Sequence, residues 1–137
     1  MPPLFDLSVI APDHQVYEGR VRSLVAPGRE GRFGVLPNHA PMLAELGVGE
    51  LKVVDERGDT HVLATASGFL EVAYGVVIVL ADAGEAAADI DVARARAAES
   101  RARERLAARI LDVDQGRAAA ALSRALNRLR VAAGTHQ

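Results

Sequence analysis

The chain has 137 residues, of which half are hydrophobic and a quarter are charged, and its formal net charge is -2. This length allows one ordinary domain, or one compact domain with a small appendage, and it excludes large multidomain proteins. The composition is typical of a protein that forms a core, and the absence of a strong basic charge argues against nucleic acid as a partner. Because no cysteine is present, disulfides, thiolate catalysis and cysteine-bound metals are excluded.

No segment of the sequence is apolar over the length of a membrane span. The longest apolar stretches, such as residues 75–81, fall far short of the roughly 18 to 20 residues that a span requires. Residues 1–6 contain neither a basic region nor a long apolar run, so we expect no signal peptide. We therefore expect no direct membrane insertion, and any membrane role would come through a partner.

The chain changes character over residues 82–91, where prolines and turn signals give way to alanine and arginine. Up to Gly84 there are six basic and eleven acidic residues, a net charge of -5. From Glu85 onward there are ten arginines and seven acidic residues, a net charge of +3. The sequence therefore predicts two domains, residues 1–84 and 85–137. Their opposite charges favour docking of one on the other, or of each on a different partner.

The first part is predicted to consist of short β-strands. Apolar and polar residues alternate in several segments, which is typical of a strand with one buried face. Short turns that contain glycine separate some of these segments into hairpins. Such a series of strands predicts an antiparallel sandwich or a flattened barrel. The expected strands cover residues 5–10, 17–25, 51–55, 60–64, 69–72 and 76–80.

The second part is predicted to form two helices joined by a short loop at residues 112–116, in an antiparallel hairpin. Apolar residues recur there at spacings of three and four, which places them on one stripe of each helix. Alanine dominates the stripes, so the helices should form readily but pack weakly. The hairpin could therefore open, or it could stay permanently docked. The stripes comprise Ala95, Ala98, Ala102, Leu106 and Ile110, then Ala118, Leu122, Ala125, Leu126 and Leu129.

Sequence motifs for catalysis are missing. The only lysine, Lys52, belongs to a strand pattern and not to a phosphate-binding loop. The four histidines are widely scattered, which argues against a metal site, and no catalytic triad pattern is present. His39 lies between two prolines, where a turn residue with local hydrogen bonds and a catalytic residue are the two interpretations.

Arginines are the remaining chemical resource of the second part. Spacings of seven and four allow the arginines of each predicted helix to share a face, and two such faces together could bind phosphate. The other interpretation is a solvated cationic surface. These arginines are Arg94, Arg101, Arg124 and Arg128.

Several segments, in their order and spacing, carry a resemblance over nearly the whole chain to the epsilon subunit of F-type ATP synthase. The most distinctive reads Gly-Val-Leu-Pro-Asn-His-Ala-Pro-Met-Leu. The resemblance implies an α+β protein in which an N-terminal antiparallel β-sandwich precedes a C-terminal antiparallel two-helix hairpin. The segments are residues 34–43, 7–13, 67–72, 79–82, 90–95 and 125–132.

The resemblance also implies a function and a set of partners. The chain would be a non-catalytic subunit of the rotary central stalk, at the cytoplasmic side of the cell membrane, and would couple proton flow to ATP synthesis. Its sandwich would bind the gamma subunit and rest on the c-ring, with the loop from Gly31 to His39 facing both. Arg32 stands where many relatives carry glutamate, and Glu30 is the nearest substitute for that acid.

In the family the helical hairpin can extend along gamma and restrain ATP hydrolysis by approaching the beta and alpha subunits. Some bacterial relatives bind ATP in the folded hairpin through an Ile/Leu-Asp-x-x-Arg-Ala motif, which residues 90–95 match. The same motif can serve only to begin a helix. The resemblance thus implies no required cofactor, with ATP as a regulatory ligand. The matching positions are Glu85, Ile90, Asp91, Arg94, Arg101, Arg124 and Arg128.

Two other classes of function remain open at this point. One is a free-standing sandwich that binds a small ligand or carbohydrate, and the other is a hydrolase that uses His39. Both would function without a partner subunit, and no motif favours either.

Overall fold

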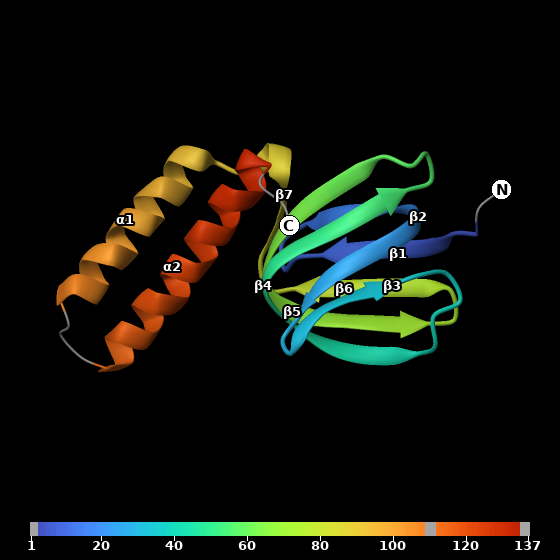
Figure 1. Ribbon diagram of the computed structural model, residues 1–137, viewed down its shortest axis with the longest axis horizontal. Coiled ribbons are helices and arrows are strands. Elements are labelled where there is room, and N and C mark those ends of the chain that lie inside the picture. Colours follow the sequence, from blue (N-terminus) through green and yellow to red (C-terminus); the bar gives the residue numbers. More distant parts are fainter. Residues whose placement is uncertain (1–2, 109–111, 135–137) are drawn as a thin grey trace. The chain divides into compact units, whose positions relative to one another are not determined.

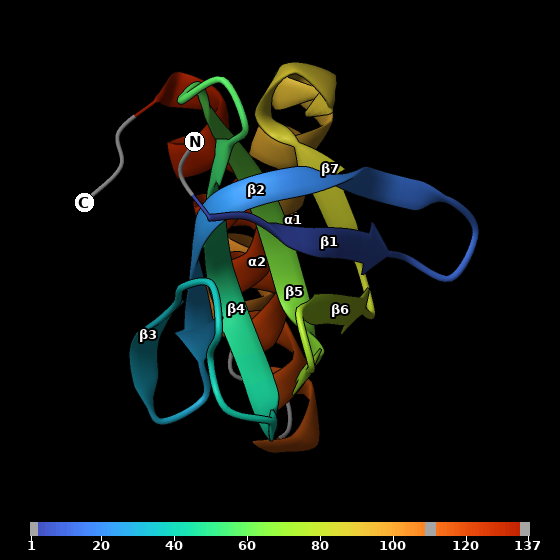
Figure 2. The same cartoon turned by 90° about the vertical axis from the view of Figure 1, so that its right-hand side faces the viewer.

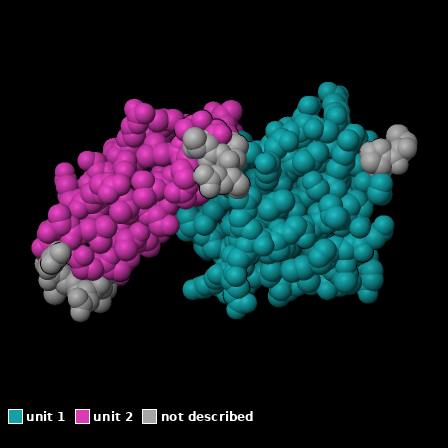
Figure 3. Space-filling view, viewed as in Figure 1, with its two compact units in different colours: residues 1–86 teal, residues 87–137 magenta. Residues whose placement is uncertain are grey.

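The protein divides into two compact units, residues 1–86 and 87–137 (Figure 3). The computed structural model describes residues 3–108 and 112–134. The division falls two residues beyond the boundary expected at Glu85, because Gly84–Ala86 form a short strand that pairs with a longer strand of the first unit.

The described part of the first unit is built of β-strands and that of the second unit is helical (Figure 1). Three strands have 14 residues, and each is longer than the segments expected from the alternation of side chains. The elements are β1 Phe5–Ile10, β2 Gln15–Gly28, β3 Gly31–Val35, β4 Met42–Asp55, β5 Thr60–Ala73, β6 Val76–Ala81, β7 Gly84–Ala86, the 3-10 turn η1 Ala87–Asp89, α1 Val92–Ala108 and α2 Asp112–Ala133.

Five strands of the first unit close into a ring, in the order β1-β6-β5-β4-β2 and back to β1 (Figure 2). The pairings are antiparallel except for β1 with β6, which is parallel. Strand directions cannot alternate all the way around a ring of five, so one pair has to be parallel. The predicted sandwich, or flattened barrel, is confirmed, but its ladder is not antiparallel throughout.

The two predicted strands at 60–64 and 69–72 are one strand, β5, with a kink. Ser67 and Gly68 interrupt the regular backbone there, with φ of 107° and 145°. A Cβ atom on Gly68 would lie 2.0 Å from the carbonyl oxygen of Leu80 on the neighbouring strand. Glycine therefore allows β5 to bend while it stays paired with β6.

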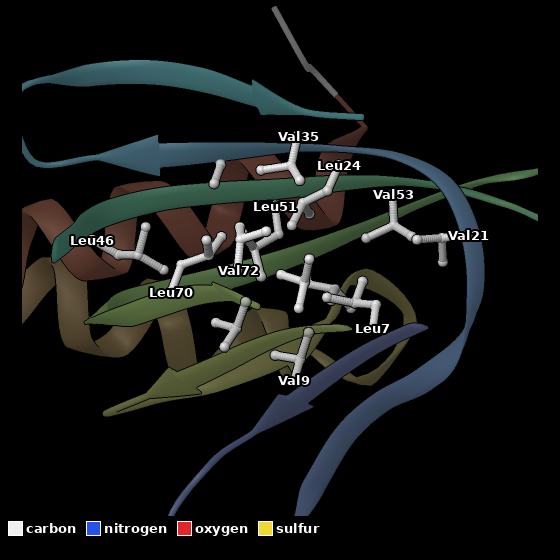
Figure 4. Packing of buried hydrophobic residues seen from close by; sticks show 14 of the residues in the cluster. Leu7, Val9, Val21, Leu24, Val35, Leu46, Leu51, Val53, Leu70 and Val72 are labelled. Carbon is white, nitrogen blue, oxygen red and sulfur yellow. The ribbon is translucent and has the colours of Figure 1, made fainter. Parts of the chain in front are cut away.

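The core of the first unit lies inside the ring of strands (Figure 4). Strand β1 shows how the sequence builds it, because Phe5, Leu7 and Val9 are buried while Asp6 and Ile10 between and after them are exposed. Each fully buried leucine or valine stabilises the fold by about 1.5 to 3 kcal/mol. The core thus holds the strands in one register, since a slip of one residue would turn every side chain of a strand to its other face.

The second unit contains α1 and α2, and both predicted helices are confirmed (Figure 1). Asp91 precedes α1 and its carboxylate accepts a hydrogen bond from the backbone N–H of Arg94 at 3.0 Å, which is an N-cap. At the other end of α1, the side-chain amide of Gln115 donates to the carbonyl of Arg105 at 3.2 Å. This bond satisfies one of the carbonyls that the end of a helix leaves without an intrahelical partner.

The predicted apolar stripes face inward in the described part of the hairpin. Alanines are the fully buried members, and the leucines of both stripes are half-buried; Ile110 lies outside the described residues. The expected loop at 112–116 is wrong, because α2 begins at Asp112.

Candidate functional site

The tip of the β2–β3 hairpin carries the first group of expected contact residues. Arg29 and Glu30 form a two-residue turn between Gly28 and Gly31, which are Cα partners. Arg29 binds Glu45 of β4 twice, through an ion pair and through its backbone N–H, which donates to the Glu45 carbonyl at 2.9 Å. Glu30, the second residue of the turn, is exposed to solvent. The turn therefore presents Glu30 from a hairpin that is tied to β4.

Arg32 lies on β3, and its side chain is partly exposed and partly packed against its own domain. Its guanidinium is 3.8 Å from Oε1 of Glu50 on β4. The Arg32 side chain is 44% exposed, whereas that of Glu50 is 13% exposed. This residue, expected to meet a partner, thus has an ion pair inside its own domain.

His39 lies in the turn that follows β3. Its backbone N–H donates to the carbonyl of Leu36 at 3.2 Å, and Nδ1 donates to the carbonyl of Ala40 at 2.7 Å. Asn38 before it adopts φ of 65°, a left-handed conformation that asparagine tolerates. These local hydrogen bonds are the ones expected if His39 is a turn residue.

A hollow of about 690 Å³ opens beside the β2–β3 hairpin, between the tip of this hairpin and β4. Both charged and apolar side chains line it, which suits contact with another protein better than capture of a small polar ligand. Within the described residues, no three His, Asp or Glu side chains gather as a metal site. The lining consists of Gly28, Arg29, Glu30, Gly31, Phe33, Leu43, Ala44 and Glu45.

An exposed apolar row crosses three neighbouring strands, and sequence reasoning missed it. Phe69 on β5 is the Cα partner of Leu80 on β6, which in turn is the partner of Ile10 on β1. These side chains are 51%, 54% and 38% exposed. Leu43 on β4, beside the hollow, is 68% exposed. We call these four residues the apolar face; the run Val-Val-Ile-Val-Leu of β6, apolar at every position, was the available signal.

The residues that match the ATP motif are distributed over both units. Asp91 and Arg94 are brought together by the N-cap, and Ile90 is buried. The arginine side chains of the group are exposed at Arg94, Arg101 and Arg124 and half-buried at Arg128. Glu85 lies on β7 in the first unit, as the Cα partner of Ala64 on β5.

Comparison with known proteins accounts for both units. The family described as ATP synthase, Delta/Epsilon chain, beta-sandwich domain matches residues 4–87, and the long alpha-helix domain of the same chain matches residues 88–133. The chain belongs to the ATP synthase epsilon family. The ATP synthase epsilon chain of Salinibacter ruber is 48% identical over 136 residues, which cover 93% of this chain and 91% of that one. The epsilon chain of Pelotomaculum thermopropionicum is 48% identical over 101 residues, 74% and 75% of the two chains.

Solved structures of ATP synthase complexes contain chains with the same fold. A chain of the Euglena gracilis mitochondrial ATP synthase superposes with a TM-score of 0.81 at 22% identity, over 99% of this chain and 84% of that one. A chain of the Tetrahymena thermophila central stalk and c-ring gives 0.58 at 11% identity, over 93% and 95%.

Membership of the epsilon family decides among the classes of function left open by the motifs. An epsilon chain is a non-catalytic subunit of ATP synthase and belongs to its central stalk, so the hydrolase and the free-standing binding protein are both wrong. The complex is associated with a membrane. Among the described helices, none is both long and apolar enough to span it.

Proposed function

We propose that this epsilon chain binds the gamma subunit through its apolar face and rests on the c-ring through the loop from Gly31 to His39. In this position it couples proton flow to ATP synthesis, at the cytoplasmic side of the cell membrane. The observation that carries the proposal is the row of neighbouring apolar side chains Phe69, Leu80 and Ile10, all of which are exposed.

The apolar face has the character of a protein interface. Covering large apolar side chains that are about half exposed stabilises a complex, by about 25 cal/mol for each Å² of apolar surface that is buried. Two acidic residues border the apolar face: Glu71 is the Cα partner of Leu43, and Glu45, which is ion-paired with Arg29, is the partner of Phe69. We therefore expect the docking surface on gamma to be apolar at its centre and basic at its edge.

Serine substitutions test this interface. Phe69→Ser and Leu80→Ser should each weaken binding of the purified chain to gamma by about 30-fold, as loss of a central aromatic or aliphatic contact does. The free energy of unfolding of the isolated chain should change little, since both side chains are exposed. Binding is measured by titration calorimetry of gamma with each variant.

Val48→Ser serves as the control, because Val48 has an exposed fraction of 37% but lies outside the row. It should bind gamma as the unmodified chain does. If Phe69→Ser and Leu80→Ser both bind gamma as tightly as the unmodified chain, gamma binds another surface and the proposed interface is wrong.

We further propose that the helical hairpin restrains ATP hydrolysis by reaching the beta and alpha subunits, and that ATP favours its compact form. Support comes from the motif at residues 90–95, which begins α1 with an aspartate cap, and from exposed guanidinium groups on both helices. Phosphate oxygens pair well with such groups. The alanine-lined contact between the helices is weak enough for a ligand to shift the balance between two forms.

A calorimetric titration of the isolated chain with ATP tests the nucleotide role. We expect saturable binding in the micromolar to millimolar range, and loss of binding and of nucleotide-induced compaction in Arg124→Ala/Arg128→Ala. The matched control Arg96→Ala/Arg117→Ala removes two helix arginines outside the motif and should leave binding intact. Compaction that persists in Arg124→Ala/Arg128→Ala would overturn this site, and no heat at several millimolar ATP would reduce Asp91 to a helix cap.

A further inference from the structure

The ladder between β2 and β4 is interrupted beneath the β2–β3 hairpin. Val25 pairs with Lys52, and the next pair along β2 joins Gly28 to Leu46. Between these pairs β2 advances by three residues and β4 by six, so the intervening part of β4 runs without a matching partner in the ladder. Backbone pairing therefore leaves the hairpin less firmly tied to β4 here than a regular ladder would.

Glu50 lies within this interrupted part of β4. Its side chain is only 13% exposed, and the Arg32 guanidinium is 3.8 Å from its Oε1. A carboxylate so far removed from water requires a nearby cation, because burial disfavours an uncompensated charge. Arg32 supplies that cation from β3, which is paired with β2 and not with β4 in the described ladders.

The strands approach closely at the same place. Pro27, the Cα partner of Arg32, packs on Gly49, where an added Cβ atom would lie 2.5 Å from the Pro27 Cβ. The Arg32 side chain thus reaches past Pro27 to the strand on its far side. A glutamate at position 32 would instead set a second carboxylate against Glu50, and like charges at such a distance repel.

We propose that Arg32 is a positioning residue: its ion pair with Glu50 crosses the interrupted ladder and holds the hairpin, and with it Glu30 and the loop that follows, in the conformation that meets the partner. The ion pair between Arg29 and Glu45 acts in the same direction at the tip. The orientation of the loop matters for function only through the contact proposed above, so this inference rests on the proposed function.

A charge exchange separates a positioning role from direct contact. Arg32→Glu and Glu50→Arg should each speed amide hydrogen exchange of residues 32–35 in the isolated chain by about tenfold, because each leaves like charges opposed. The double variant Arg32→Glu/Glu50→Arg restores opposite charges and should return exchange to within about threefold of the unmodified chain. Arg32→Lys and Glu50→Gln provide milder forms in case a single reversal fails to fold.

The same variants in the reassembled complex give the functional readout, the number of protons pumped per ATP hydrolysed. Arg32→Glu should lower this coupling, and the double variant should restore it. If Arg32 instead binds the partner directly, the double variant stays uncoupled although its amide exchange is restored, and that result would overturn the proposal. Unchanged exchange in all variants would overturn it as well.

Arg57→Glu is the matched control, since Arg57 is exposed in the turn at the opposite end of β4. It should alter neither amide exchange at 32–35 nor coupling. If the single reversals speed amide exchange while coupling stays normal, the ion pair holds the hairpin but the proposed contact between the loop and the c-ring is wrong. That result would separate this inference from the proposed function.

Discussion

Asp55 shows how much one carboxylate can organise at the end of a strand. It accepts hydrogen bonds from the backbone N–H groups of Arg57 and Asp59, each at 2.9 Å, and from Nε2 of His61 at 2.7 Å. The Tyr17 ring lies 5.5 Å from the His61 ring. The His61 hydrogen bond is the main cause that lowers the pKa of Asp55 below its ordinary value of 3.8. Burial raises the pKa of Tyr17, with a smaller contribution from the Asp55 charge.

The depressed pKa of Asp55 has a consequence for acid stability. A carboxyl whose pKa is lower in the folded chain stabilises the fold above its unfolded pKa, and this contribution is lost as the pH falls through the folded value. In His61→Phe, which keeps an aromatic ring beside Tyr17 but removes the donor, the pKa of Asp55 should rise toward 3.8. Carbon-detected NMR titration of the Asp55 carboxyl measures it.

His14→Ala is a suitable control, because His14 pairs with Asp13 in a different turn and lowers the pKa of that carboxyl instead. It should leave the Asp55 titration where it is. An Asp55 midpoint that is the same in His61→Phe and in the unmodified chain would contradict the assigned cause.

At the scale of elements, β5 links several parts of the first unit, because it pairs with β4, β6 and β7. Its kink at Ser67 and Gly68 lets it pair with β7 through one half and with β6 through the other. The alternation of side chains predicts two strands here because a kinked strand changes its pattern at the bend.

Gly68→Ala should therefore lower the free energy of unfolding by about 2 to 4 kcal/mol, since the new Cβ atom meets a backbone carbonyl of β6 that cannot move without opening the pair. Gly75→Ala is the control: Gly75 also has a positive φ, 83°, but nothing lies within 4 Å of its added Cβ. It should cost only about 1 kcal/mol of backbone strain. Urea unfolding that shows equal losses for the two variants would contradict the close approach at Gly68.

The helices illustrate the opposite balance between local and tertiary forces. Alanine, arginine and glutamate favour helix along the whole of α1, and Asp91 caps its start, so local preferences suffice to define it. Its fully buried residues are Ala95 and Ala102, which cover little apolar surface. The helical element is thus strongly determined while its packing is weakly held.

At the scale of the whole molecule, the two units differ in charge as well as in structure. The sandwich and the helical hairpin each match a separate domain of the same family, and the change in net charge from acidic to basic falls at the same part of the chain. An acidic unit with an apolar face and a basic unit with weak internal packing are suited to different partners. The expected response to ATP belongs to this scale, because it concerns the balance between forms of the hairpin.

The features that sequence predicted well are those set by neighbours along the chain. The hairpin turns and the alternation of β1 depend on residues a few positions apart, and so does the cap at Asp91. The ion pair of Arg32 with Glu50 could not be predicted, because it joins residues 18 positions apart through a break in a ladder. The apolar row of Phe69, Leu80 and Ile10 depends on the register of three strands, which the sequence pattern does not specify.

Composition, periodicity and ordered motifs are properties of the amino-acid sequence, so they sufficed to predict the two-part organisation, the class of each part and the family. The folded structure was needed to show that the ring of five strands contains a parallel pair, that the apolar row is exposed and that Arg32 faces a carboxylate. Each of these depends on which strands become neighbours and in what register. Long-range packing sets that choice, since many segments of similar local preference can pair and only the buried core selects among them.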